Sequence, residues 1–256
     1  MSVSVRRDLL GRTETQLLLG DEVEVLEESG GWSCIRIPDQ PAARMDPRGY
    51  PGWLPTRQLR RLDGSPPKAE RLVCRRRTAL HTAPAGPVAV AGVCYGTRLR
   101  VLGDAIDGWL PVGSLGHGRN LWVAAQAMAT PDNPGGGAGL LAAADMFLGT
   151  PYLWGGLTPH GIDCSGLVHL IYRRYGVQVP RNSEDQQEQA SPVPLGNERP
   201  GDLYFFTRGE EPAHHVGFVI RRGVMLDACY TAGRVTAHVL TDDRRRTLAA
   251  AGRFGG

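Results

Sequence analysis

The chain has 256 residues, of which 41% are hydrophobic and 21% charged, so it has an ordinary globular composition and room for two or three domains. Its 29 basic and 26 acidic side chains leave a net charge of only +3, which does not indicate a nucleic-acid-binding protein. No apolar run approaches the ~20 residues that a membrane-spanning helix needs, and the first residues show no apolar leader.

The 5 cysteines are odd in number and lack the close spacing of a disulfide framework or a zinc site. Together with the bland charge balance, this pattern predicts a monomer in a reducing compartment such as the cytoplasm. It also predicts a small-molecule or peptide partner rather than a nucleic acid or a membrane. We expect no metal and no organic cofactor.

Two N-terminal stretches share one pattern of short strands. Residues 20–32 and 96–109 each begin with a Gly turn, continue with alternating apolar and polar residues and an acidic turn, and end in Gly-Trp. Each unit then reaches a second tryptophan, Trp53 or Trp122. A duplicated unit of this kind predicts two small β-barrels that resemble bacterial SH3-like domains. We place them at residues 1–62 and 70–129, with a linker at 63–68.

The third domain, residues 138–256, follows a second linker at 131–137 and has a different texture. Apolar residues at helical spacing predict one helix over about residues 140–148 and another over about 165–175, with Gly149 and Gly176 as their ends. Strand-like runs follow at 203–206, 216–220, 224–228 and 235–240. Helices followed by an antiparallel meander predict an α+β domain.

A glycine-rich loop delivers Cys164 to the first turn of the second of these helices. Unpaired backbone N–H groups and the positive end of the helix favour a thiolate there. Because the thiolate is the reactive form of cysteine, this position indicates a nucleophile. A buried structural cysteine is the alternative interpretation.

His215 stands at the start of the strand 216–220, where it could serve as the base for Cys164. Its neighbour His214 should face the opposite side of that strand. With a three-residue turn after the strand, Asp227 becomes the diagonal neighbour of His215 and could orient the imidazole. A register change of one residue would instead leave Asp227 a solvated hairpin residue. Cys229 is predicted to be a packed strand residue.

The other histidines lack such a setting, and we predict surface positions for them, namely His81, His117, His160, His169 and His238. His160 is close to Cys164 in the chain and is the one among them that could line the site.

Five motifs occur in order in this third domain: Tyr-x-Trp-Gly-Gly, Asp-Cys-Ser-Gly, Pro-Arg-x-Ser-x-x-Gln, Pro-Gly-Asp-Leu and His-Val-Gly. In this order they resemble the NlpC/P60 family of papain-like cell-wall peptidases. With two SH3-like units in front, the chain is similar to the γ-D-glutamyl-L-diamino acid endopeptidases of that family. The resemblance implies cleavage after γ-D-Glu in murein peptides such as L-Ala-γ-D-Glu-diaminopimelate, by way of an acyl-enzyme formed on the thiolate, during recycling of bacterial cell wall.

The resemblance also implies roles for individual residues. Cys164 is the expected nucleophile, His215 the base and Asp227 the third catalytic member. Tyr152 is expected to support the oxyanion beside Cys164. The residues that it implies for substrate binding are Tyr50, Trp154, Asp163, Ser165, Asn182 and Ser183. Tyr50, from the first SH3-like unit, is expected to close the pocket around a free N-terminal amine.

Two positions depart from the family pattern. Asp227 stands where the family often has His, and Asn182 stands where these endopeptidases usually have Asp. A neutral amide binds an ammonium group less strongly than a carboxylate does, so selection for a free amine should weaken unless Asp163 supplies the charge. The sequence leaves open a cell-wall amidase or an acyl or amide transferase with the same Cys-His-Asp site, and a non-catalytic cell-wall-binding protein.

Overall fold

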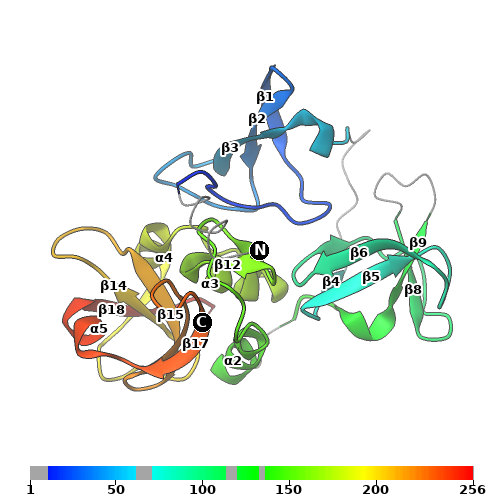
Figure 1. Cartoon of the computed structure of the whole chain (residues 1–256). Helices are drawn as coiled ribbons and strands as arrows, with labels where there is room; N and C mark the ends of the chain where they lie inside the picture. The colour runs from blue at the N-terminus through cyan, green and yellow to red at the C-terminus, as the bar shows by residue number, and fades with distance from the viewer. Residues whose placement is uncertain (1–10, 62–70, 114–119, 133–135, 256) are drawn as a thin grey trace.

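The computed structural model describes residues 11–61, 71–113, 120–132 and 136–255, which form two all-β units and an α+β domain (Figure 1). The predicted linker at 63–68 lies outside the described residues, as do residues 133–135 of the second linker. Within these ranges, no helix has both the length and the apolar character that crossing a bilayer would require.

The first unit is one antiparallel sheet of strands β1 (Glu24–Ser29), β2 (Trp32–Ile37) and β3 (Tyr50–Pro55), followed by the short helix η1 (Thr56–Gln58). As predicted, Trp32 opens a strand directly after a glycine turn. Ile35, Ile37 and Tyr50 are buried in a small core of this unit. Tyr50 is paired with Ile37 at the end of β3, and this pairing fixes where its side chain leaves the sheet.

The second unit has two sheets, with strand orders β10-β4-β7 and β6-β5-β9-β8. Trp109 opens β8 and Trp122 lies in β9, as the repeat pattern predicts. Hydrogen-bonded pairs among the described residues do not close either unit into a barrel, so the closed barrels remain a prediction. The elements of this unit are β4 (Arg71–Val73), β5 (Arg77–His81), β6 (Val88–Cys94), β7 (Arg98–Leu99), β8 (Trp109–Val112), β9 (Leu121–Ala124), η2 (Ala125–Ala127) and β10 (Met128–Ala129).

The third domain packs helices against an antiparallel sheet, as the sequence predicts. The sheet order is β13-β18-β14-β15-β16-β17. The predicted meander forms its larger part, whereas the two strands at the other edge, β13 and β18, have no counterpart among the predicted strands. The elements are α2 (Gly137–Asp145), β11 (Leu157–Thr158), β12 (Gly161–Ile162), α3 (Cys164–Arg174), α4 (Ser183–Gln189), β13 (Ser191–Val193), β14 (Leu203–Phe206), β15 (His215–Arg221), β16 (Val224–Cys229), β17 (Arg234–Val239), α5 (Asp242–Thr247) and β18 (Leu248–Arg253).

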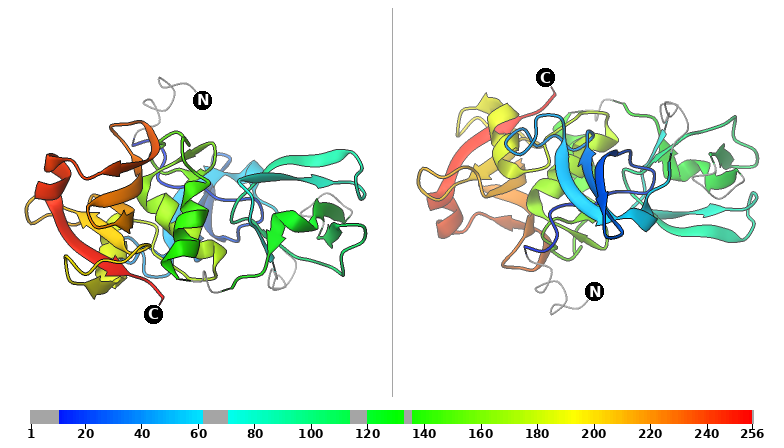
Figure 2. Two further views of the ribbon diagram at one scale, coloured as in Figure 1. Left: turned by 90° about the horizontal axis from the view of Figure 1, so that it is seen from below. Right: turned by 90° about the horizontal axis from the view of Figure 1, so that it is seen from above.

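Helix α3 lies at the centre of the molecule, and every residue in it is buried (Figures 1 and 2). One side packs on β15 and β16. Near its C-terminal end, Arg173 forms an ion pair with Asp21 of the first unit and donates to the carbonyl of Gly96 in the second. Both β units are therefore fastened to the helix that carries Cys164 at its other end.

Candidate active site

Cys164 is the first residue of α3, and local structure holds it there. Asp163 caps the helix, because its Oδ1 accepts from the backbone N–H of Gly166 at 2.6 Å. A side chain at Gly166 would place Cβ 2.3 Å from the carbonyl oxygen of Gly156. The glycines of the loop thus allow the backbones to approach closely, and the largely buried thiol sits at the positive end of a helix.

His215 and Asp227 meet on one face of the sheet. His215 Nε2 lies 2.5 Å from Asp227 Oδ2, and both side chains are buried. Phe218 pairs with Leu226, and continuing this register puts Asp227 opposite Gly217 and diagonal to His215. The sequence left two registers open, and the observed register places Asp227 on the same face as His215 and not in solvent. A Cβ on Gly217 would stand 2.9 Å from that of Asp227, which explains the glycine in His-Val-Gly.

The charges around His215 favour its protonated form. Burial alone would lower the pKa of His215, but the negative charge of Cys164 and hydrogen bonds to Asp227 and Cys164 outweigh it and raise the pKa to about 9. Burial would raise the pKa of Asp227, but hydrogen bonds from histidines hold it below its usual value. The arrangement therefore supports a thiolate–imidazolium pair with a carboxylate behind it.

Tyr152 lies beside this pair and is buried. Its ring meets that of Tyr230 edge to face at 5.4 Å. Burial raises the pKa of Tyr152, and the nearby negative charges of Cys164 and Asp163 raise it further. The hydroxyl thus stays protonated at neutral pH and is able to donate a hydrogen bond to a developing oxyanion.

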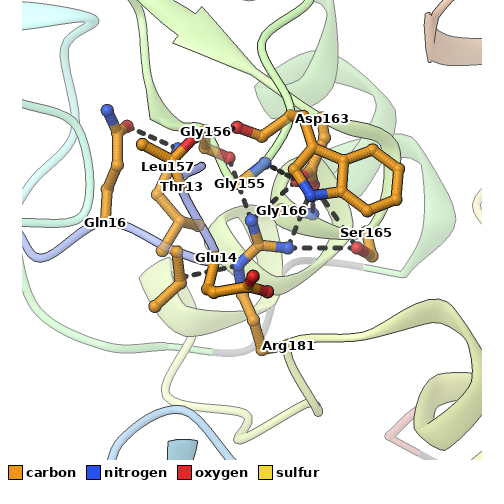
Figure 3. Close-up of polar contacts among 12 residues, drawn as sticks. Thr13, Glu14, Gln16, Gly155, Gly156, Leu157, Asp163, Ser165, Gly166 and Arg181 are labelled. Carbon is orange, nitrogen blue, oxygen red and sulfur yellow. Dashed lines mark hydrogen bonds and ion pairs between the residues drawn. The ribbon is translucent and has the colours of Figure 1, made fainter. Parts of the chain in front are cut away.

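The carboxylate of Asp163 has ion-pair and hydrogen-bond partners within the protein (Figure 3). Its two oxygens bind the guanidinium of Arg181 at 3.0 and 2.8 Å, and Oδ2 also accepts from the N–H of Gly155 at 2.7 Å. Arg181 further donates to Ser165 Oγ at 3.1 Å and to Thr15 Oγ1 at 2.9 Å. Asp163 and Ser165, which the resemblance implies for substrate binding, therefore lie in a buried network whose centre is Arg181, a residue for which no role was predicted.

Tyr50 reaches this network from the first β unit. Its hydroxyl donates to the backbone carbonyl of Glu14 at 3.4 Å. Burial raises the pKa of Tyr50, whereas the charge of Arg181 and a hydrogen bond with Asn182 act in the opposite direction, so all these groups are neighbours. The exposed carboxylate of Glu14 lies within the same electrostatic neighbourhood.

Two more of the residues expected to bind substrate are Ser183 and Trp154. Ser183 is buried and donates to the carbonyl of Ala213 at 2.7 Å, which helps to fix the segment before His215. Trp154 belongs to the glycine-rich loop before Cys164, and 45% of its surface is exposed. Its backbone carbonyl accepts from Thr13 at 3.1 Å, another link to the first unit. Binding of substrate remains a prediction for all six residues, namely Tyr50, Trp154, Asp163, Ser165, Asn182 and Ser183.

Three of the histidines predicted to be on the surface are not, and one of these, His81, is half-buried at the end of β5. His169 is buried in α3, where Nδ1 contacts the carbonyl of Val179 at 2.7 Å and burial lowers its pKa to about 3. His238 is half-buried on β17 and binds Asp227. His160 and His214 are exposed, and His117 lies outside the described residues. These errors arise because the sequence of one strand or helix does not reveal which neighbouring element packs against it.

The buried ion pair yields a stability prediction. Arg181→Met leaves Asp163 buried without its guanidinium partner, and such a loss typically costs about 3–5 kcal/mol. We expect a large fall in the midpoint of urea unfolding, followed by circular dichroism. The control is Arg48→Met, because the pair of Arg48 with Asp46 is on the surface. Equal effects of the two substitutions would contradict the assignment.

The chain is similar to known proteins over most of its length. The NlpC/P60 family matches residues 149–248, and a bacterial dipeptidyl-peptidase SH3 domain matches residues 11–59. A γ-D-glutamyl-L-lysine dipeptidyl-peptidase of Bacillus subtilis is 31% identical over 231 residues, which are 90% of this chain and 76% of that protein. The protein of the same name from Bacillus cereus is 33% identical, over 84% of this chain and 67% of the other.

Among solved structures, a crystal structure of an NlpC/P60 family protein from Bacillus cereus matches with a TM-score of 0.89 and 30% identity. It covers 99% of this chain and 86% of that chain. The arrangement of an SH3-like β region and an NlpC/P60 α+β domain is therefore shared over nearly the full chain described here.

Proposed function

Because this chain belongs to the NlpC/P60 family of cysteine peptidases, we propose that it hydrolyses the bond between γ-D-Glu and a diamino acid in murein peptides. The observation that carries the proposal is the assembly of Cys164, His215 and Asp227, with Tyr50 of the first β unit near Asp163, the residue that caps the Cys164 helix. The names of the similar Bacillus proteins support the same bond and an N-terminal dipeptide as the released product.

In the proposed reaction, the sulfur of Cys164 attacks the γ-carbonyl carbon of D-Glu. The oxyanion that forms would accept hydrogen bonds from Tyr152 and from backbone N–H groups at the start of α3. His215, protonated at neutral pH, gives its proton to the amine of the leaving diamino acid, and a thioester remains on Cys164. His215 then takes a proton from water, whose oxygen attacks the thioester and releases the dipeptide.

The charge distribution supports a substrate with a free N-terminal amine. Asn182 is neutral, and both oxygens of Asp163 are engaged by Arg181, so Asp163 is not the carboxylate that would bind an ammonium group. Glu14 offers an exposed carboxylate close to Tyr50 instead. An ammonium group there would gain a charge-assisted hydrogen bond. We therefore infer that Glu14 fills the role left open by Asn182.

The test is incubation with L-Ala-γ-D-Glu-meso-diaminopimelate, with its L-lysine analogue and with the N-acetylated form of each, followed by mass spectrometry. We expect cleavage of the free-amine peptides to L-Ala-D-Glu and the free diamino acid. The acetylated peptides should be cut at least about tenfold more slowly, the loss expected for one hydrogen bond to a charged group. Glu14→Gln should raise KM for the free-amine peptides only, with Glu22→Gln, an acidic residue of the same unit, as control.

Other results would contradict parts of the proposal. If no peptide is cut, the substrate class is wrong. Equal rates for free and acetylated peptides would exclude an amine pocket formed by Tyr50 and Glu14. A product joined to an added amine would indicate a transferase, because transfer and hydrolysis share the thioester and differ only in the acceptor.

A further inference from the structure

The Asp227 carboxylate binds a second imidazole besides that of His215. Its Oδ2 lies 2.5 Å from His215 Nε2, and its Oδ1 lies 2.8 Å from His238 Nε2. Asp227 is on β16, between β15 with His215 and β17 with His238, and its side chain is completely buried. Met225 pairs with His238, so His238 is the diagonal neighbour of Asp227 on the same face of the sheet.

The hydrogen bonds of His238 determine its charge. Nδ1 lies 3.2 Å from the carbonyl oxygen of Val239, and Nε2 faces a carboxylate oxygen. Both partners are acceptors, so Nε2 donates its proton to the carboxylate, and a second proton on Nδ1 lets that nitrogen donate as well, which favours the imidazolium form. The hydrogen bond to Asp227 also raises the pKa of His238, while burial and the charge of Arg244 on α5 act against it.

The net charge of the buried catalytic cluster explains why a fourth charged group beside Asp227 would stabilise it. A thiolate, an imidazolium and a carboxylate in one buried cluster have a net negative charge, which is costly to bury. When His238 is protonated, the charges alternate from Cys164 to His215, Asp227 and His238, and the sum is zero. Cys229 lies close by, and the donor atoms of Asp227, Cys229 and His238 are within 4.8 Å of one another. Both oxygens of Asp227 are already engaged by the imidazoles, so hydrogen bonding accounts for this cluster.

We propose that His238 is a positioning residue that holds the Asp227 carboxylate toward His215 and compensates its charge. It acts through Asp227 and does not touch the reacting atoms. The inference rests on the proposed catalytic roles of Cys164, His215 and Asp227. With one donor fixed on each oxygen, the carboxylate cannot rotate away from His215, so the imidazole stays oriented toward Cys164.

The test compares His238→Leu with His238→Gln in the full chain. Leucine removes the donor, whereas the glutamine amide can donate from nearly the position of Nε2. Val239→Leu is the matched control, because Val239 is the exposed neighbour of His238 on β17 and receives the same new side chain. Two readouts are measured as functions of pH: kcat for the peptide that the wild-type protein cuts, and the rate at which iodoacetamide alkylates Cys164. Peptide mass spectrometry separates Cys164 from the other cysteines.

We expect His238→Leu to lower both rates at pH 7 by about tenfold, the loss of one hydrogen bond to a charged group, with KM nearly unchanged. Without this donor the pKa of Asp227 rises, so its carboxylate forms only at higher pH. The acid limb of both pH profiles therefore moves to higher pH. His238→Gln should recover most of the rate and of the profile, and Val239→Leu should match wild type.

Two outcomes would overturn the proposal. In the first, His238→Leu matches wild type in rate and profile. In the second, His238→Leu and His238→Gln lose the same rate with a wild-type profile, which would reduce His238 to a packing role. The alkylation readout needs no substrate, so a wrong peptide assignment is distinguishable from a wrong role for His238.

Discussion

Cys164→Ala is expected to abolish peptide hydrolysis, with kcat/KM falling by about 10⁴-fold or more, as is usual when a covalent nucleophile is removed. The reason is geometric. Cys164 is the one cysteine among those described that lies at a helix N-terminus next to a protonated imidazole and a buried tyrosine hydroxyl. Without its sulfur no thioester can form, and His215 has no nucleophile to serve. The measurement is cleavage of L-Ala-γ-D-Glu-meso-diaminopimelate, followed by mass spectrometry.

Cys229→Ala is the control for this prediction. Cys229 is buried near Asp227, and its sulfur accepts from the N–H of Ala232 at 3.4 Å, so the substitution should leave kcat within a few-fold of wild type. Iodoacetamide should react faster with Cys164 than with Cys34, Cys74, Cys94 or Cys229. A Cys164→Ala protein with substantial activity, or preferential labelling of another cysteine, would exclude the thioester mechanism.

The sequence predicts the parts of the fold that have a local cause. Alternation and apolar runs indicate the strands β14 to β17, and each lies within two residues of its predicted bounds. Strand β18 was missed because Leu248 is followed by three alanines and a glycine, a composition with little strand preference. This segment is a strand because it fits between β13 and β14, and such pairing at long range leaves no mark in the segment itself.

The same limit applies to the site. Glycines, a helix start and a strand start indicate Cys164 and His215, and the diagonal position of Asp227 follows once the turn length is fixed. Arg181 binds a carboxylate 18 residues away and a threonine 166 residues away, contacts that no local pattern contains. His238 was predicted to be a surface residue because its sequence neighbourhood lacks the setting that indicates His215. Its role depends on the register between β16 and β17.

Asp227→Asn is expected to lower kcat by up to about 10⁴-fold, the loss that follows the same substitution in a Ser-His-Asp triad. Asparagine has nearly the same shape, so the sheet should remain intact and the loss should reflect charge and tautomer. An amide that donates to His215 Nε2 would move the proton to Nδ1, where it would face Cys164 in the neutral imidazole.

The pH profile separates this effect from a loss of structure. In the native protein the pKa of His215 is raised to about 9, so the imidazolium persists at neutral pH and activity should fall as pH rises through that value. The charge of Asp227 helps to offset the lowering of the His215 pKa by burial. Removing that charge lowers the pKa of His215 and moves the alkaline limb to lower pH. Asp243→Asn, on the exposed face of α5, should change neither kcat nor the limb. If Asp227→Asn lowers kcat but leaves the alkaline limb in place, Asp227 does not act through the charge of His215. The Cys-His-Asp assignment would then have to give way to a Cys–His pair supported by packing alone.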